Sequence, residues 1–466
     1  MQKSDRSTML GTMEMSRLIP KISLPIMASM LIQALYNIVD SIFVSRYDPN
    51  GLTAVSLAFP FQMLMIALSN GMGTGINSLV SRRLGEKKGE AARQAAWSGL
   101  VVEGSGSLLF IFFGLLLAGS AMRLVVSENL QDAASILEMG TQYLTIVTVF
   151  SIGIFMAIYF ERLLQATGNT VLSMITQMAG AITNIILDPI LIFGYLGFQP
   201  MGVAGAAIAT VIGQWISAGL GFLFNQYRNR ELRLSLKECR IFRRDLAGIC
   251  AVGFPSTIMM AISSVMNAGL NAILSGFEQA NAAVNVMSVY FKLQSFIFMP
   301  VFGLSNGIIA IVAYNFGARL KERIYRCIRV ALLWAGIIML VGTLVFMIFP
   351  EQLMSIFESD ANAELTSQMT EIGMVAMRII SSSFLFAAIG IIISTVFQAV
   401  GKGVYSMVIS ICRQLAVLLP AAWLIARLTG DVYAVWWCFP IAETVALILS
   451  LYYYRRCNQK LIAPMA

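Results

Sequence analysis

Two acidic residues lie inside long apolar stretches of the sequence, where a charge is costly. Asp40 shares one helical face with Gln33 and Tyr36, because the three are spaced by three and four residues. Asp188 shares a face with Asn184 at a spacing of four. Ionisable groups at membrane depth cost at least about 2.5–3.5 kcal/mol on insertion scales, so they mark either function or paired structure.

Pro189 directly follows Asp188 in the stretch ITNIILDP. Proline lacks a backbone donor and disfavours helix at the preceding residue, so a carbonyl is expected to be freed here. A freed carbonyl, an amide and carboxylates suit a small hard cation or a proton. The alternatives are that Asp40 only caps a helix end beside Ser41 and that Asp188 lies at a loop edge.

Three basic residues, Lys292, Arg378 and Arg413, also fall inside predicted helices. They indicate either a positively charged cavity that meets substrate or an acid of the first half, or structural cations held by ion pairs and carbonyls. Arg378 can also snorkel to the membrane surface.

Three glutamates have less obvious roles. Glu161 adjoins Arg162 at a helix end and is expected to be solvated. Glu103 and Glu443 lie within predicted helices, Glu103 without an evident partner.

The composition indicates the elements that must hold these residues. Of 466 residues, 58% are hydrophobic and 12% charged, and the mean hydropathy is +0.77. Soluble chains carry roughly a quarter charged residues, whereas apolar blocks of about 20 residues match the thickness of a bilayer. The alternation of outer-membrane strands is absent, and the first block is interpreted as a retained helix rather than a signal peptide. The prediction is an all-α polytopic membrane protein with twelve transmembrane helices at 19–41, 52–79, 94–118, 136–160, 166–193, 201–224, 247–273, 281–312, 327–349, 372–396, 404–427 and 433–455.

Charge and cysteine usage exclude several classes of protein. The sequence has no histidine, which excludes a histidine-ligated metal site, and its six cysteines form no C-x-x-C pair. The net charge of +8 is attributed to membrane loops rather than to nucleic-acid binding. Most Lys and Arg fall on the side of the two termini, and only Arg46, Arg123 and Arg427 fall on the other. Both termini are therefore predicted to be cytoplasmic.

An internal repeat divides the chain. LSNG occurs at 68–71 and 304–307, QATG at 165–168 resembles QAVG at 398–401, and Pro25 corresponds to Pro255. These near-constant offsets predict an N-lobe at 1–224 with helices 1–6, a basic cytoplasmic linker at 225–246, and a C-lobe at 247–466 with helices 7–12. Two similar lobes that rock about a central cavity are the recurring plan of secondary transporters.

The residues around the two acids resemble those of MATE (multidrug and toxic compound extrusion) transporters. The similar stretches are LIQALYNIVDSIFVSR, LSNGMGTGINSLVSRRLG, LLQATGNT, NIILDPILIFG and GVAGAAIATVIGQ. The resemblance extends over nearly the whole chain and is greatest to the DinF-like and MepA-like bacterial branch.

That resemblance implies a V-shaped, monomeric inner-membrane exporter, in which H⁺ or Na⁺ antiport drives amphipathic, mostly cationic drugs outward by alternating access. It implies no cofactor, and it allows Na⁺ as the metal at the Asp40/Asp188 cluster. It places a cation site at Asp40, Asn184, Asp188 and Thr210, cavity-lining positions at Gln33 and Tyr36, and a kink in helix 1 at Pro25. The predicted substrate cavity also includes Asn37 and the helix-borne cations Lys292 and Arg413.

Two other classes of membrane protein are alternatives to an exporter. A flippase for a lipid-linked precursor would use a related architecture with a more cationic cavity. Lys292 and Arg413 are consistent with this alternative. An intramembrane enzyme would need H-E-x-x-H, impossible without histidine, or paired aspartates in G-x-G-D, which the sequence lacks. The chain is therefore predicted not to be an enzyme.

Overall fold

The chain is almost entirely helical. The computed structural model describes residues 7–127, 132–235, 239–356 and 363–465. Its long helices are α2 (Met15–Tyr47), α3 (Pro49–Gly85), α4 (Gly89–Leu116), α6 (Ala133–Val149), α7 (Ile152–Ala166), α8 (Thr170–Phe193), α9 (Gly202–Tyr227), α10 (Arg243–Leu274), α11 (Ala280–Gly317), α12 (Lys321–Ile348), α14 (Ala363–Ser381), α15 (Phe384–Ala399), α16 (Gly403–Ile411), α17 (Leu419–Thr429) and α19 (Cys438–Cys457). Shorter ones are α1 (Thr8–Thr12), α5 (Ala118–Val125), α13 (Pro350–Ser355) and α18 (Val432–Val435).

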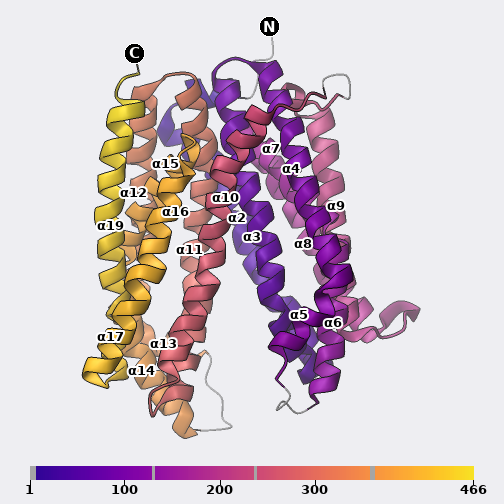
Figure 1. The fold of residues 1–466 in the computed structure, drawn as a ribbon, viewed down its shortest axis with the longest axis vertical. Helices are drawn as coiled ribbons and strands as arrows, with labels where there is room; N and C mark the ends of the chain where they lie inside the picture. Colours follow the sequence, from indigo (N-terminus) through magenta and orange to yellow (C-terminus); the bar gives the residue numbers. More distant parts are fainter. Residues whose placement is uncertain (1–6, 128–131, 236–238, 357–362, 466) are drawn as a thin grey trace.

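The helices have the length and apolar character of membrane spans. Within the described ranges, ten are long and apolar enough to cross a membrane, and twelve spans result if the pairs α6/α7 and α14/α15 each count as one. The all-α polytopic prediction is thereby confirmed. The chain enters and leaves the helical bundle at the same end, as an even number of spans requires (Figure 1).

Two predicted helices are bent, by 46° between α6 and α7 and by 49° between α14 and α15. At the second bend, Ser381, Ser382 and Ser383 each donate a hydroxyl hydrogen bond to the carbonyl three residues earlier, at 3.3, 2.6 and 2.8 Å. Such bonds compete with the backbone ladder of the helix. The apolar character of 372–396 predicted the span but not this break.

A third irregularity interrupts the span at 403–429. Residues Cys412–Leu418 form a π-helix between α16 and α17, and Pro420 follows at the start of α17. Proline has no N–H, and its ring clashes with the carbonyl four residues earlier. The wider π-helical turn before Pro420 lets the helix continue despite the proline. π turns are also frequent at functional sites.

In the described part of the chain, the two halves contact each other at one end. Figure 1 shows α2–α9 on one side and α10–α19 on the other, separating away from the end that carries the termini. A single buried core crosses both halves and includes Leu10 and Ile76 from the first half and Val301 and Phe397 from the second. A separate core around Met122 fills the other end of the first half.

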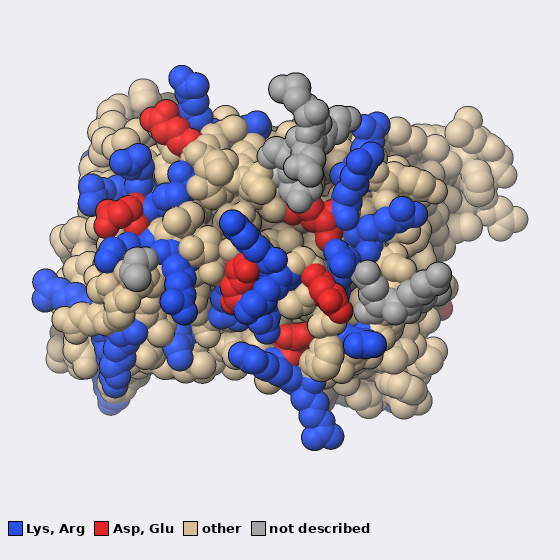
Figure 2. All heavy atoms as spheres, turned by 90° about the horizontal axis from the view of Figure 1, so that it is seen from above, with Lys and Arg blue, Asp and Glu red and all other residues tan. Residues whose placement is uncertain are grey.

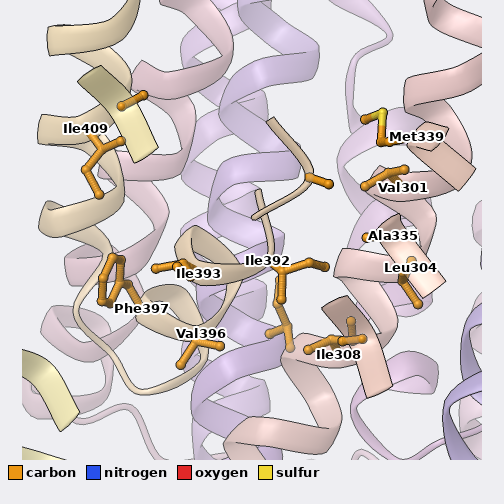
Figure 3. Close-up of a cluster of buried hydrophobic side chains, with 14 of the residues drawn as sticks. Val301, Leu304, Ile308, Ala335, Met339, Ile392, Ile393, Val396, Phe397 and Ile409 are labelled. Carbon is orange, nitrogen blue, oxygen red and sulfur yellow. The ribbon is translucent and has the colours of Figure 1, made fainter. Parts of the chain in front are cut away.

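Part of the larger core lies among α11, α12 and α15. Figure 3 shows Leu304 and Ile308 of α11, Ala335 of α12 and Ile392 of α15 directed toward one another. All four side chains are at most 2% exposed. This packing holds α11 in position, and α11 in turn contacts the first half.

Glycines bring the halves together. α3 packs on α10 and α11, and α11 packs on α2. A methyl group on Gly85 of α3 would overlap the carbonyl of Tyr314 in α11, and one on Gly317 of α11 would overlap the carbonyl of Arg82 in α3. These reciprocal contacts leave room only for glycine, so the backbones of the two halves touch directly.

The same reasoning gives a test at Gly75, where a methyl group would overlap the backbone carbonyl of Ile249 in α10. Overpacking of this kind costs about 1–3 kcal/mol, so Gly75→Ala is expected to lower the melting temperature of the purified protein. Gly104→Ala is the matched control, because nothing lies within 4 Å of a methyl group there, and alanine stabilises a helix interior by roughly 0.5–1 kcal/mol. Equal melting temperatures for the two variants would contradict the close contact.

Candidate functional site

The four residues of the expected cation site come from three neighbouring helices. Asp40 lies in the last third of α2, Asn184 and Asp188 lie in α8, and Thr210 lies in α9. α8 packs against both α2 and α9. Asp188, Asn184 and Thr210 are 0%, 3% and 7% exposed, so neither the loop-edge alternative for Asp188 nor exposure to lipid fits the structure.

The amide of Asn184 connects Asp188 with Thr210. In the amide orientation that satisfies both neighbours, its nitrogen donates to Asp188 Oδ2 at 3.1 Å and its oxygen accepts from Thr210 Oγ1 at 3.2 Å. Asn184 therefore holds the Asp188 carboxylate in a fixed position. The spacing of four residues that predicted a shared face for Asn184 and Asp188 is realised as this contact.

Asp40 is the unsatisfied member of the group. Its Oδ1 is buried and accepts no hydrogen bond from any described residue. Asp40 and Asp188 interact electrostatically, and Tyr36 interacts with both. A buried carboxylate oxygen without a partner is costly, and a second carboxylate nearby adds to the cost. A proton or a small cation between the two acids would remove both penalties.

A cavity of about 120 Å³ lies within the first half; Tyr36, Asn184 and Thr210 line it, whereas Asp40 and Asp188 do not. A buried water needs roughly 10–15 Å³ measured in this way, so the cavity has room for several waters or for a hydrated cation. Its polar wall includes Gln33, Tyr36, Asn184, Thr210 and Glu161. The two cavity residues expected on α2, Gln33 and Tyr36, thus lie beside the cation site.

The other expected cavity residues are not on this wall. The side chain of Asn37 lies outside the described residues. Lys292 and Arg413 belong to the second half, and neither lines the cavity. Pro25 lies inside the continuous helix α2, where its carbonyl accepts a hydrogen bond from Ser29 Oγ at 3.0 Å.

Glu161 is not solvated, and that prediction was wrong. The residue is 7% exposed, and its two carboxylate oxygens accept hydrogen bonds from Gln165 and Gln177, both at 2.6 Å. Arg162 donates to Gln165 at 2.9 Å and to Asn70 at 2.8 Å. The adjacent acid and base are thus bridged by the amide of Gln165 inside the protein. The spacing of four between Glu161 and Gln165 was the signal available in the sequence.

Glu103 also has a partner that the sequence did not reveal. Ser69 Oγ of α3 donates to Glu103 Oε2 of α4 at 2.9 Å, and Glu103 is 0% exposed. Its Oε1 accepts no hydrogen bond from the described part of the chain. Among the described residues, the first half therefore contains three buried carboxylates, Glu103, Glu161 and Asp188, in α4, α7 and α8. Asp40 in α2 is half-buried, with its Oδ1 out of contact with solvent.

The second half contains an ion pair at membrane depth. Arg413 Nη1 lies 3.0 Å from Glu443 Oε1, and the side chains are 28% and 16% exposed. Arg413 belongs to the π-helix and Glu443 to α19. Of the two interpretations of Arg413, the structure fits the ion pair, while Lys292 and Arg378 are exposed.

Replacing one partner of this ion pair is expected to lower the stability of the protein more than replacing both partners. Arg413→Met is expected to destabilise the protein by up to about 3 kcal/mol, because it leaves Glu443 partly buried without its cation. Arg413→Met/Glu443→Leu is expected to recover most of that loss. Thermal melting checks both results, and a stable double variant that no longer transports would show that the ion pair is needed for transport and not only for stability.

The spans, the two halves and the buried carboxylates beside a polar cavity are features of a membrane transporter. Comparison with known protein families identifies the family of transporters. The MatE family model matches residues 25–190 and 255–424, and the chain belongs to this family of transporters. It is a multi-pass membrane protein and not an enzyme.

Individual relatives agree over nearly the full length. The chain is 25% identical over 447 residues to the multidrug export protein MepA of Staphylococcus haemolyticus (strain JCSC1435), covering 95% of this chain and 94% of that one. It is 26% identical over 438 residues to MepA of Staphylococcus saprophyticus, covering 92% and 91%. A MOP superfamily transporter from Pyrococcus furiosus Vc1 has the same fold, with a TM-score of 0.89, 24% identity and 99% coverage of both chains.

Proposed function

We propose that this protein exports amphipathic, mostly cationic compounds by antiport against H⁺ or Na⁺. The observation that carries the proposal is the buried Oδ1 of Asp40, which has no hydrogen-bond partner among the described residues and interacts with Asp188, near a cavity that Asn184 and Thr210 line. The names of the MepA relatives support the choice of drugs as cargo. The site itself supports the choice of a small cation as the coupling ion, since carboxylate, amide and hydroxyl oxygens are ligands for hard cations.

The proposed orientation places both termini in the cytoplasm. Figure 2 shows Lys and Arg side chains spread over the end of the molecule that carries the termini, with fewer Asp and Glu among them. An excess of basic residues in short loops favours the cytoplasmic side. Asp40 and Asp188 lie toward the far ends of α2 and α8, so the coupling ion enters from outside.

The coupling follows from charge. With both carboxylates ionised, the cavity attracts a cationic drug, and a bound proton or Na⁺ cancels that attraction. The cation and the drug therefore favour different loading states of one cavity, which is the thermodynamic requirement for exchange. The cavity of about 120 Å³ is smaller than the roughly 300–1,000 Å³ of drug-sized sites, so drug binding requires the helices of the first half that line it to move apart.

Liposomes with imposed gradients test this proposal. The purified protein is reconstituted, a pH gradient or a Na⁺ gradient is imposed separately, and a fluorescent cationic dye is followed. Dye movement driven by one of the gradients is expected. Accumulation of a lipid-linked precursor without any dye movement would favour the flippase alternative, which the ion-paired state of Arg413 makes less attractive.

A further inference from the structure

A second cavity lies at the opposite end from the cation site, where the two halves meet. It measures about 740 Å³, well within the range of sites that hold small molecules. The ends of α3 and α11 and the C-terminal segment line it, and it is open to the surface. We call it the interlobe pocket, and its lining residues are Arg82, Gly85, Glu86, Lys87, Lys88, Phe316, Gly317, Ala318, Arg319, Leu461, Pro464 and Met465.

The charge of the interlobe pocket is unbalanced. Its one acid, Glu86, already pairs with Lys88 at 2.9 Å and with Arg83 at 3.4 Å. Arg82, Lys87 and Arg319 form no ion pair with any described residue. Among the described residues, the pocket thus presents three cations that lack a close ion pair, two from the first half of the chain and one from the second.

Two of these cations adopt a backbone conformation that is uncommon for them. Lys87 has φ 57° and Arg319 has φ 58°, in the left-handed region that glycine adopts freely and that costs other residues about 1–2 kcal/mol. Each follows the terminal glycine of its helix by two residues, Gly85 in α3 and Gly317 in α11. On each side of the pocket, a basic side chain therefore occupies a position where glycine would be more stable. This indicates that the positive charge has a function there.

We propose that the interlobe pocket binds a phosphate-bearing anion, supplied in the cell by the headgroup of an anionic phospholipid. Arg and Lys clusters bind phosphate oxygens by charge-assisted hydrogen bonds, and basic pockets among transmembrane helices on the cytoplasmic side suit lipid headgroups. Phe316, Leu461 and Met465 give the pocket an apolar wall against which the glycerol and the first acyl carbons can pack.

The bound anion would connect the two halves. Arg82 and Lys87 belong to α3 and the loop after it, and Arg319 follows α11. The reciprocal contacts of Gly85 and Gly317 hold these segments backbone to backbone. An anion shared between them strengthens the interface at this end. The binding itself does not depend on the proposed export activity, so each can fail without the other.

Lipid binding to the purified protein in neutral detergent tests the pocket. Water-soluble dioctanoyl phosphatidylglycerol, dioctanoyl phosphatidylcholine and inorganic phosphate are titrated separately, and the dissociation constants are measured by thermophoresis. The variant Lys87→Gln/Arg319→Gln removes one cation from each side. Each basic residue near an anionic lipid is worth a factor of about five, so roughly thirty-fold weaker binding of phosphatidylglycerol is expected.

The matched control is Arg228→Gln/Arg326→Gln, which removes two exposed cations that do not line the pocket. It is expected to bind phosphatidylglycerol like the wild type, and melting temperatures show that both variants are folded. If inorganic phosphate also binds, and binds more weakly to the Lys87→Gln/Arg319→Gln variant, the result supports an anion site in the pocket that a soluble phosphate can fill. Equal losses in the two variants, or no loss in the first, would overturn the proposal.

Discussion

The Asp40→Asn protein is expected to reach the membrane in normal amounts and to lose drug export. Asparagine keeps the size of the side chain but holds no negative charge, so the cluster with Asp188 can no longer exchange a proton or Na⁺ against the drug. Coupling free energies between sites are about 1–3 kcal/mol, so transport at matched expression is expected to fall by roughly 5- to 150-fold. Dye efflux from cells or liposomes measures this.

Asp48→Asn provides the matched control, because it makes the same chemical change eight residues further along the chain. Asp48 is the N-cap of α3, and its Oδ1 accepts a hydrogen bond from the backbone of Asn50 at 2.8 Å. Asparagine is an equally good N-cap, so this variant is expected to transport normally. Full export by Asp40→Asn at matched expression would remove Asp40 from the mechanism.

Arg162→Met is expected to destabilise the protein by about 3–5 kcal/mol, the second large effect. Arg162 is 4% exposed and connects Asn70 with Gln165, and Gln165 in turn binds Glu161. Removing the guanidinium leaves the buried carboxylate of Glu161 without its nearby positive charge, and breaking a buried charge network in this way costs several kcal/mol. The melting temperature in detergent, together with the yield of folded protein, measures the loss.

Neutralising the acid as well identifies the cause of that loss. Glu161→Gln/Arg162→Met is expected to be more stable than Arg162→Met alone, because the introduced glutamine carries no charge that needs compensation. If the double variant is as unstable as the single one, the loss comes from packing of the arginine stem rather than from the unpaired carboxylate.

The spans were predictable from the sequence because apolar length alone determines them. The predicted helix at 166–193 and the observed α8, Thr170–Phe193, differ by a few residues at one end. The bends were not predictable in this way. The one beside Ser381–Ser383 depends on hydroxyl groups that bond back to the chain, and hydropathy does not register those bonds.

The grouping of residues at the proposed cation site was predictable to the extent that they lie on shared helical faces. The contact between Asn184 and Asp188 follows from a spacing of four residues. The pairing of Arg413 with Glu443 does not, because the two residues are 30 positions apart and on different helices. Glu161 was misplaced because its neighbour Arg162 suggested a solvated pair, whereas the partner from α8, Gln177, comes from the tertiary fold.

The measurement that tests the cation site most directly is the release of ions on drug binding. Purified protein in weakly buffered, low-sodium solution is mixed with a saturating cationic dye, and free H⁺ and Na⁺ are recorded together. The wild type is expected to release one of the two ions in near-stoichiometric amount, and Asp40→Asn/Asp188→Asn to release neither while remaining folded. Equal release from the wild type and the double variant would contradict an ion site at these carboxylates.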